Sequence, residues 1–155
     1  METGMVHLHN VIRWIILILL VVSIVVAFTG WQRKRVFKPS DKKVWLFTMI
    51  VAHINFLVGL YLILLGRSGY LKVEIPEGTS IMKNTTLRFF LVEHPLMMLI
   101  SIVLITLGHG MAKKAVPDNT KFRKAFWFFL VALILVLVAI PWPGREVARP
   151  LFPGM

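Results

Sequence analysis

The hydrophobic and polar residues of this chain are separated into long blocks. Four mostly apolar runs cover about residues 11–28, 44–65, 88–108 and 124–140. Each run is close to the ~20 residues that an α-helix needs to cross a hydrocarbon core ~30 Å thick. The polar residues between the runs are too few to cover four apolar helices in water. The pattern therefore predicts four membrane-spanning helices.

The connections between the runs indicate how the helices are arranged. Pro39 and Pro117 lie in short polar connections, where a helix cannot continue, and IPWPG at 140–144 ends the fourth run. Short loops place consecutive helices side by side and antiparallel. We therefore expect an all-α fold, an integral membrane four-helix bundle with up-down-up-down topology. A single domain then covers residues 1–155.

The composition agrees with a membrane protein and excludes several kinds of site. Of the 155 residues, 57% are hydrophobic and 16% are charged, which differs from an ordinary soluble domain. The chain has no cysteine, which excludes disulfides, thiolate metal sites and a C-x-x-C-H haem attachment. No Lys or Arg precedes the first run, and WQRKR at 31–35 follows it. We expect this run to be a retained anchor rather than a signal peptide.

The positive charge is concentrated in two connections. Of 18 Lys and Arg residues, six lie in 31–43 and five lie in 111–124. The positive-inside rule puts both connections in the cytoplasm, so the N-terminus and the C-terminus lie outside a bacterial inner membrane. The net charge of +11 therefore serves topology and contacts with the lipid bilayer. No nucleic-acid partner is expected.

A few ionisable side chains fall inside or at the edge of the apolar runs, where they are costly and usually mark function. His9 begins the first run with Arg13 one turn later, His53 lies within the second, and Glu93 and His94 lie in the third. These five are the candidate cofactor-binding residues, and the three histidines are candidate metal ligands. No catalytic residue is assigned. For His53, the alternative is an ordinary hydrogen bond between helices.

The stretch EHPLMM at 93–98 gives His94 a distinctive context. Pro95 cannot donate a backbone hydrogen bond to Leu91, so we expect a kink that re-aims His94. Glu93 points about 100° away from His94 on a helix. It would support a ligand, accept a proton or balance Arg13, or else lie in water at the interface.

The depth of each histidine does not select a ligand pair. At ~1.5 Å per residue, His53, His94 and His9 lie ~14, ~21 and ~28 Å from the inner boundary. His94 is compatible with either of the other two. His109 is expected to be an inner-interface residue.

These motifs together resemble a family of small four-span bacterial membrane proteins described as cytochrome-b-like. The resemblance covers nearly the whole chain and rests on His9 with Arg13 and Trp14, on Ala52-His53 with Asn55 and Gly59, on EHPLMM after Arg88-Phe89-Phe90, and on IPWP at 140–143. It implies haem b held by His9, His53 and His94 in some pairing, with Arg13 near a propionate.

Three functions follow as hypotheses. The first is a membrane haem b protein that transfers electrons between quinol or quinone and an outer-side acceptor, working with other membrane redox subunits. The second is a cofactor-free accessory or structural subunit of a membrane complex. The third is a copper-handling protein, because imidazoles and thioethers suit Cu(I); its ligands would be Met5, His7, His9, His94, Met97 and Met98. Enzymatic activity and a homo-oligomer are left open.

The charge pattern gives a prediction about topology. Reporter domains fused at Lys38 and at Asn119 should be active only when the reporter works in the cytoplasm, because eleven cations hold these connections inside. A reporter that works only outside the cell, active at both positions, would overturn the orientation.

Overall fold

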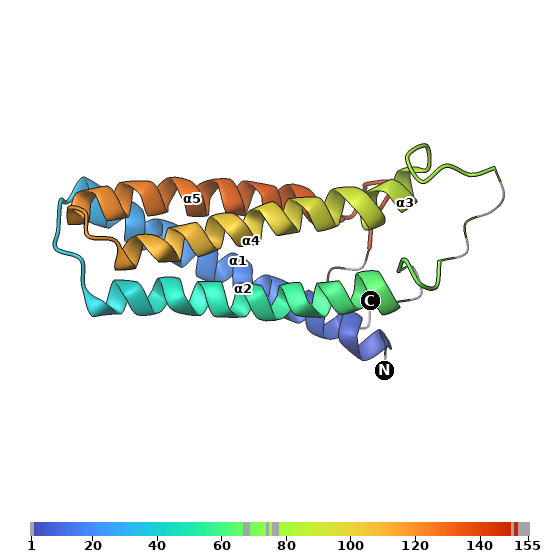
Figure 1. Cartoon of the computed structure of the whole chain (residues 1–155), viewed down its shortest axis with the longest axis horizontal. Helices are drawn as coiled ribbons and strands as arrows, with labels where there is room; N and C mark the ends of the chain where they lie inside the picture. The colour runs from blue at the N-terminus through green and yellow to red at the C-terminus, as the bar shows by residue number, and fades with distance from the viewer. Residues whose placement is uncertain (1, 67–68, 74, 76–77, 150, 152–155) are drawn as a thin grey trace.

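The computed structural model describes residues 2–66, 69–73, 75, 78–149 and 151. These residues form helices and connections and contain no strand (Figure 1). The elements in chain order are α1 (Glu2–Gln32), α2 (Pro39–Leu65), α3 (Thr85–Arg88), a π-helical turn (Phe89–Glu93), α4 (His94–Gly110), a 3-10 turn (Met111–Lys113) and α5 (Asp118–Ala139).

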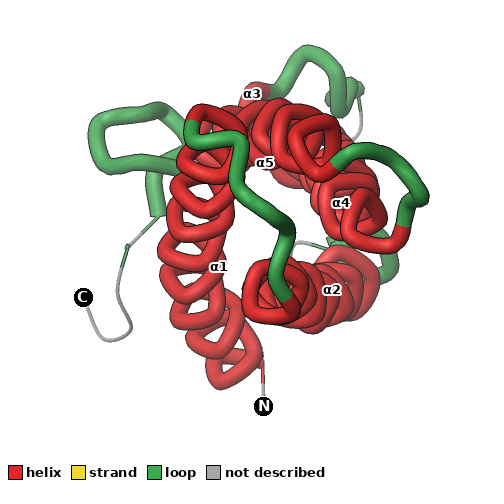
Figure 2. The backbone as a smooth tube through the Cα atoms, turned by 90° about the vertical axis from the view of Figure 1, so that its left-hand side faces the viewer, coloured by secondary structure: helices red, strands yellow, loops and turns green. Residues whose placement is uncertain are grey.

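The four long helices surround one core. α1 packs against α2 and α5, and α4 packs against α5 and α2, so that α1 and α4 lie diagonally across the bundle (Figure 2). The largest fully buried side chains include Trp45, Phe89, Phe122 and Phe129. We call the end with residues 33–38 and the 3-10 turn the basic end. The opposite end, where α1 begins and α5 ends, is the α3 end.

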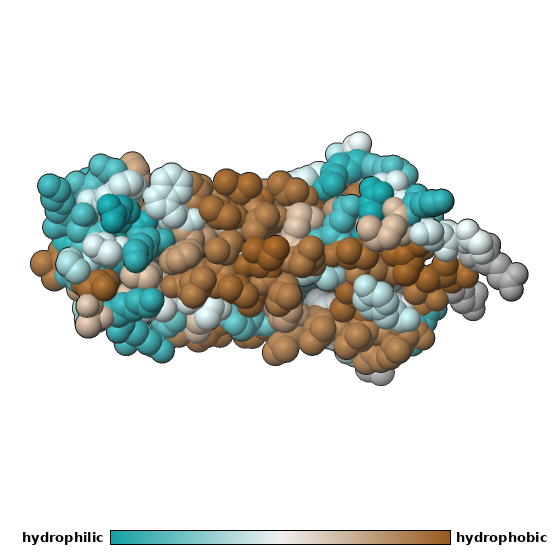
Figure 3. Space-filling model, turned by 45° about the horizontal axis from the view of Figure 1, so that its top comes forward, coloured by the Kyte–Doolittle hydropathy of each residue, from teal (hydrophilic) through white to brown (hydrophobic). Residues whose placement is uncertain are grey.

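All four predicted spans correspond to long apolar helices. The segments Thr3–Gln32, Pro39–Leu65, Thr85–Lys113 and Asp118–Ala139 are long and apolar enough to cross a membrane. Figure 3 shows hydrophobic side chains around the middle of the molecule and hydrophilic ones gathered toward the ends. The helices extend past the apolar runs because polar residues continue the hydrogen-bonded turns at their ends.

Side-chain carboxylates order the basic end. Asp41 forms two hydrogen bonds with the Arg35 guanidinium, at 2.7 and 2.8 Å, and accepts the Lys38 backbone N–H at 2.8 Å. Asp118, in the first turn of α5, accepts the Phe37 backbone N–H at 2.9 Å. These contacts supply acceptors to backbone donors that a helix start leaves unpaired. They also fix the connection between α1 and α2 against the start of α5.

Two prolines leave the last turn of α5 short of donors. A helix would pair the carbonyls of Leu137 and Ala139 with the N–H groups of residues 141 and 143, and both of these are proline. The Trp142 indole instead donates to the Leu137 carbonyl at 2.8 Å. Nδ1 of His94 bonds the Ala139 carbonyl at 2.9 Å. Because a carbonyl only accepts, Nδ1 carries the hydrogen.

A third proline has the same effect at the start of α4. We expected Pro95 to produce a kink, and the chain forms a π-helical turn there, in which the His94 N–H bonds the Phe89 carbonyl five residues earlier. Pro95 offers no N–H to the preceding turn, and the Leu91 carbonyl accepts the Tyr70 hydroxyl. Leu91 is buried, and an unpaired buried carbonyl costs ~1–3 kcal/mol, so the Tyr70 hydroxyl offsets a defect that Pro95 creates.

This pairing predicts an energetic coupling between Tyr70 and Pro95. Tyr70→Phe should lower the free energy of unfolding by ~1–3 kcal/mol, the cost of leaving a buried acceptor unpaired. In a Pro95→Ala background the same change should cost much less, because alanine supplies the backbone N–H that proline lacks. Unfolding in mixed detergent micelles measures both values.

The control is Tyr61→Phe, since the Tyr61 hydroxyl has no hydrogen bond within the part of the chain that the structure describes. Equal costs of Tyr70→Phe in the two backgrounds would show that the hydroxyl does not replace the missing donor.

Candidate functional site

Two of the predicted histidines meet inside the α3 end of the bundle. The ring centroids of His9, on α1, and His94, on α4, lie 6.2 Å apart with an angle of 66° between the ring planes. The two helices are diagonal neighbours, so the rings approach each other across the interior. Phe89 also packs against His94, with ring centroids 6.0 Å apart.

A glycine on α2 gives His9 its position. A Cβ built on Gly59 would lie 3.2 Å from Cε1 of His9, closer than most side-chain contacts. The absence of a side chain at Gly59 thus lets the His9 ring lie against α2. Asn55, one turn earlier on the same face, is buried. Nδ1 of His9 and Oδ1 of Asn55 are both buried without a hydrogen-bond partner in the described structure.

Arg13 lies one turn after His9 and is only 8% exposed. Its Nη2 donates to the Leu151 carbonyl at 2.7 Å, and Nη1 donates to the Asn10 side chain at 3.4 Å. Its Nε is buried without a partner, and among the described residues no carboxylate pairs with it. A buried guanidinium without a carboxylate makes this region electropositive and suited to an anionic group.

Glu93 pairs with Arg88 rather than with Arg13. Nε of Arg88 donates to Oε1 of Glu93 at 2.7 Å, and both side chains are at least a third exposed. The two residues are five positions apart, a spacing that an α-helix does not bring onto one face. The π-helical turn between them has i→i+5 hydrogen bonds, and this wider turn aligns the two side chains. Glu93 therefore faces Arg88 at a partly exposed edge of the bundle.

His53 lies apart from this pair. Its Nδ1 bonds the carbonyl of Met49 at 2.8 Å, and its Nε2 is 3.5 Å from Oγ1 of Thr106. Thr106 follows His94 by twelve residues on α4, which corresponds to ~18 Å along the helix axis. The sequence left His9 and His53 as alternative partners of His94. The structure brings His9 and His94 together and leaves His53 in the half of the bundle nearer the basic end.

Two histidines remain, His109 and His7, and neither has a described ring contact with the His9–His94 pair. His109 is 3% exposed at the end of α4, and neither of its ring nitrogens has a hydrogen-bond partner among the described residues. His7 is half-buried, two residues before His9. Within the described residues, no group of three or more His, Cys, Asp or Glu side chains is arranged to hold a metal ion.

The sequence did not reveal two backbone contacts of the site. The Ala139 carbonyl accepts a hydrogen bond from His94, and the Leu151 carbonyl accepts from Arg13 and, at 3.2 Å, from the Trp14 indole. A signal for the first contact exists, since Pro143 follows Ala139 by four residues and removes its usual donor. The second contact has no such signal, because it depends on how the C-terminal segment folds back over α1.

Comparison with protein-family models, with curated proteins and with solved structures gave no match. The fold and the site define only a class of protein. It is an all-helical chain with four helices long and apolar enough to cross a membrane, and it has a histidine pair beside a buried arginine.

The Arg13 contact yields a prediction that does not depend on any cofactor. Arg13→Gln should speed backbone hydrogen exchange in residues 145–151 about tenfold. A charge-assisted hydrogen bond contributes ~1.5–3 kcal/mol, and ~1.4 kcal/mol already corresponds to tenfold. Mass spectrometry of peptic peptides measures the rates.

Arg149→Gln is the comparison variant: it removes only the stacking of the Arg149 guanidinium on the Phe90 ring, 4.8 Å from its centroid, a contact of ~0.5–1 kcal/mol, so it should speed exchange less than Arg13→Gln, which releases the Leu151 carbonyl. Unchanged exchange in Arg13→Gln would mean that Arg13 does not hold the C-terminal segment.

Proposed function

We propose that this protein is a membrane haem b protein that transfers electrons between quinol or quinone and an acceptor on the outer side of the bacterial inner membrane. The observation that carries the proposal is the separation of 6.2 Å between the rings of His9 and His94. Two imidazoles that approach this closely from diagonal helices are the residues that would hold the haem iron.

The hydrogen bonds around the pair suit this role. Nδ1 of His94 donates to the Ala139 carbonyl, so Nε2 keeps its lone pair for a metal. Ligating histidines commonly have their second ring nitrogen fixed in this way. Nδ1 of His9 is buried and unpartnered. The His9 ring would turn from Gly59 toward His94 to complete the pair.

Arg13 suits the acidic groups of haem. Its buried guanidinium retains an unpartnered Nε, which would hold a propionate by a charge-assisted hydrogen bond. When bound, b-type haem would supply one-electron transfer at a potential set by the residues that hold it and by its burial. The chain itself would exclude water, keep both imidazoles neutral and balance negative charge with Arg13.

Glu93 would handle the proton that accompanies quinol oxidation. Arg88 holds Oε1 of its carboxylate at 2.7 Å, and Oε2, which lies outside this ion pair, would accept the proton. Because both side chains are partly exposed at the edge of the bundle, the proton would leave toward the outside. A quinone and other membrane redox subunits are the partners that this role requires.

A cofactor-free accessory subunit is the second candidate, and a specific observation favours it. The hydrogen bond from His94 to Ala139 already gives this histidine a structural purpose at the end of α5. Under this alternative, the His9–His94 contact and Arg13 hold helices together. The copper hypothesis has less support, since Met98, one of its proposed ligands, packs against the hydrophobic core.

Visible spectra of the detergent-purified protein, oxidised and dithionite-reduced, test the proposal together with metal analysis. We expect the α-band of a low-spin b-type haem. His94→Ala should abolish the low-spin spectrum, and His9→Ala should convert it to a five-coordinate one, because each removes one ligand of the pair.

The matched controls are His53→Ala and His109→Ala, which should keep the low-spin spectrum because neither ring belongs to the pair. Colourless, metal-free protein from cells supplied with haem would favour the accessory subunit, and colourless protein with stoichiometric copper would favour copper handling. A low-spin spectrum unaltered in His94→Ala would reject the ligand assignment.

A further inference from the structure

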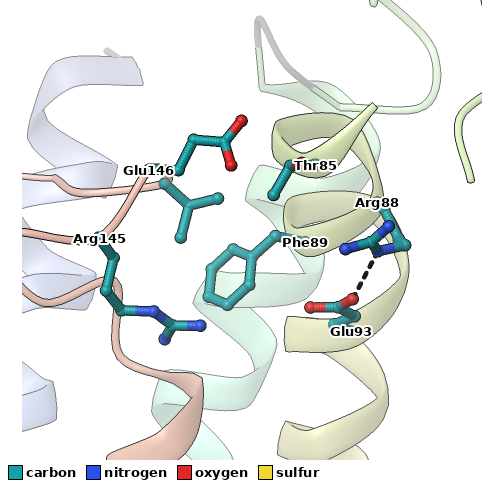
Figure 4. A pocket seen from close by; sticks show the side chains of 7 residues that line it. Thr85, Arg88, Phe89, Glu93, Arg145 and Glu146 are labelled. Carbon is teal, nitrogen blue, oxygen red and sulfur yellow. Dashed lines mark hydrogen bonds and ion pairs between the residues drawn. The ribbon is translucent and has the colours of Figure 1, made fainter. Parts of the chain in front are cut away.

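A polar pocket opens at the α3 end, next to the candidate site. Its volume is ≈ 310 Å³, at the lower end for small-ligand sites. Figure 4 shows Arg145 and Glu146 of the C-terminal segment on one side and Thr85, Arg88 and Glu93 on the other, with Phe89 between them.

Both guanidinium groups of the pocket are held in place by the protein. Nη1 of Arg145 donates to the carbonyls of Val138 and Ile140, at 2.9 and 3.1 Å, and the guanidinium lies 5.1 Å from the centroid of the Phe89 ring. These bonds use one nitrogen, and the edge formed by Nε and Nη2 has no partner among the described residues. This edge matches two oxygens of a phosphate. Arg88 is fixed by its ion pair with Glu93.

The pocket contains negative groups as well. Glu146 is exposed and forms no ion pair with any described residue. Glu93 uses Oε1 for Arg88 and has Oε2 left. Two carboxylates therefore accompany two guanidiniums, so the pocket is balanced in charge. This arrangement favours a ligand that carries both signs and disfavours a simple anion, which the carboxylates would repel.

The position of the pocket points to the boundary of a membrane. Thr85 begins one of the four segments able to cross a membrane, and α5, which forms another, ends at Ala139, six residues before Arg145. Phospholipid headgroups occupy this level of a bilayer. The pocket is partly open and is lined mostly by polar and charged side chains, as a headgroup site requires.

We infer that this pocket binds a phosphoethanolamine group, with the phosphate on Arg145 and Arg88 and the ammonium on Glu146 and Glu93. The group would come from a zwitterionic phospholipid or from a soluble phosphoethanolamine ester. The inference is independent of haem. It adds a second ligand site. Phe89, which lines this site, packs against His94, and their ring centroids lie 6.0 Å apart.

Isothermal titration of the full-length protein in detergent tests the inference. The probes are dihexanoyl phosphatidylethanolamine, dihexanoyl phosphatidylglycerol, O-phosphoethanolamine and inorganic phosphate. We expect the ethanolamine lipid to bind at least about tenfold more tightly than the glycerol lipid, because only the former offers an ammonium to Glu146. Glu146→Gln should remove most of this preference, because the ethanolamine lipid loses its partner for the ammonium while the anionic glycerol lipid loses a repelling carboxylate and binds somewhat more tightly.

Two further variants make the result specific. Arg149→Gln, on the same segment but not in the pocket lining, should bind as the parent does. Arg145→Lys keeps the charge but loses the two-nitrogen edge, and it should weaken all phosphate-containing probes. Unchanged elution and circular dichroism show that each variant is folded.

The outcomes separate the sources of the ligand. If O-phosphoethanolamine binds as tightly as the lipid, the inference holds with a soluble ester as ligand; if only the lipid binds, it holds with a phospholipid. Equal binding of the two lipids overturns the inference, as does inorganic phosphate binding as tightly as O-phosphoethanolamine. An unchanged lipid preference in Glu146→Gln also overturns it.

Discussion

Three prolines leave backbone carbonyl groups without their usual N–H donors. The structure depends on the side chains that pair with these carbonyls instead. Pro141 and Pro143 remove the donors for the last turn of α5, where the Trp142 indole and the His94 imidazole replace them. Pro95 does the same at the start of α4, where the Tyr70 hydroxyl bonds the Leu91 carbonyl. Because Leu91 and Ala139 are buried, water does not reach their carbonyls, and each needs a side chain as a substitute donor. These bonds tie α4, α5, the loop after α2 and the C-terminal segment together at one end of the bundle.

The same constraint shapes the candidate site. A histidine that donates Nδ1–H to a fixed carbonyl holds one tautomer and one ring orientation, with Nε2 free to accept. His94 therefore serves the end of α5 and, in the proposed haem protein, would be ready to ligate iron without further arrangement. The structural and ligating roles of this residue do not compete, since they use different nitrogens. His9, by contrast, lies against Gly59 with Nδ1 unpartnered, and it is the member of the pair that would move.

Much of the fold could be predicted from the sequence, and less of the site. The apolar blocks indicated four long helices, and all four are present. The choice between His9 and His53 was not predictable, because depth along a helix does not fix which way a side chain faces. The Arg88–Glu93 ion pair was missed because α-helical phase separates residues five apart, and only the π-helical turn aligns them.

Both the end of α5 and the proposed ligand pair depend on one tautomer of His94, which holds its hydrogen on Nδ1, bonded to the Ala139 carbonyl, and keeps Nε2 unprotonated. Nitrogen NMR of the protein labelled with ¹⁵N-histidine, assigned by comparison with His94→Gln, measures the protonation of each ring nitrogen directly. We predict a neutral His94 ring near pH ~7 with a protonated Nδ1 and an unprotonated Nε2. A ring protonated on Nε2 alone, or on both nitrogens, would contradict the claim.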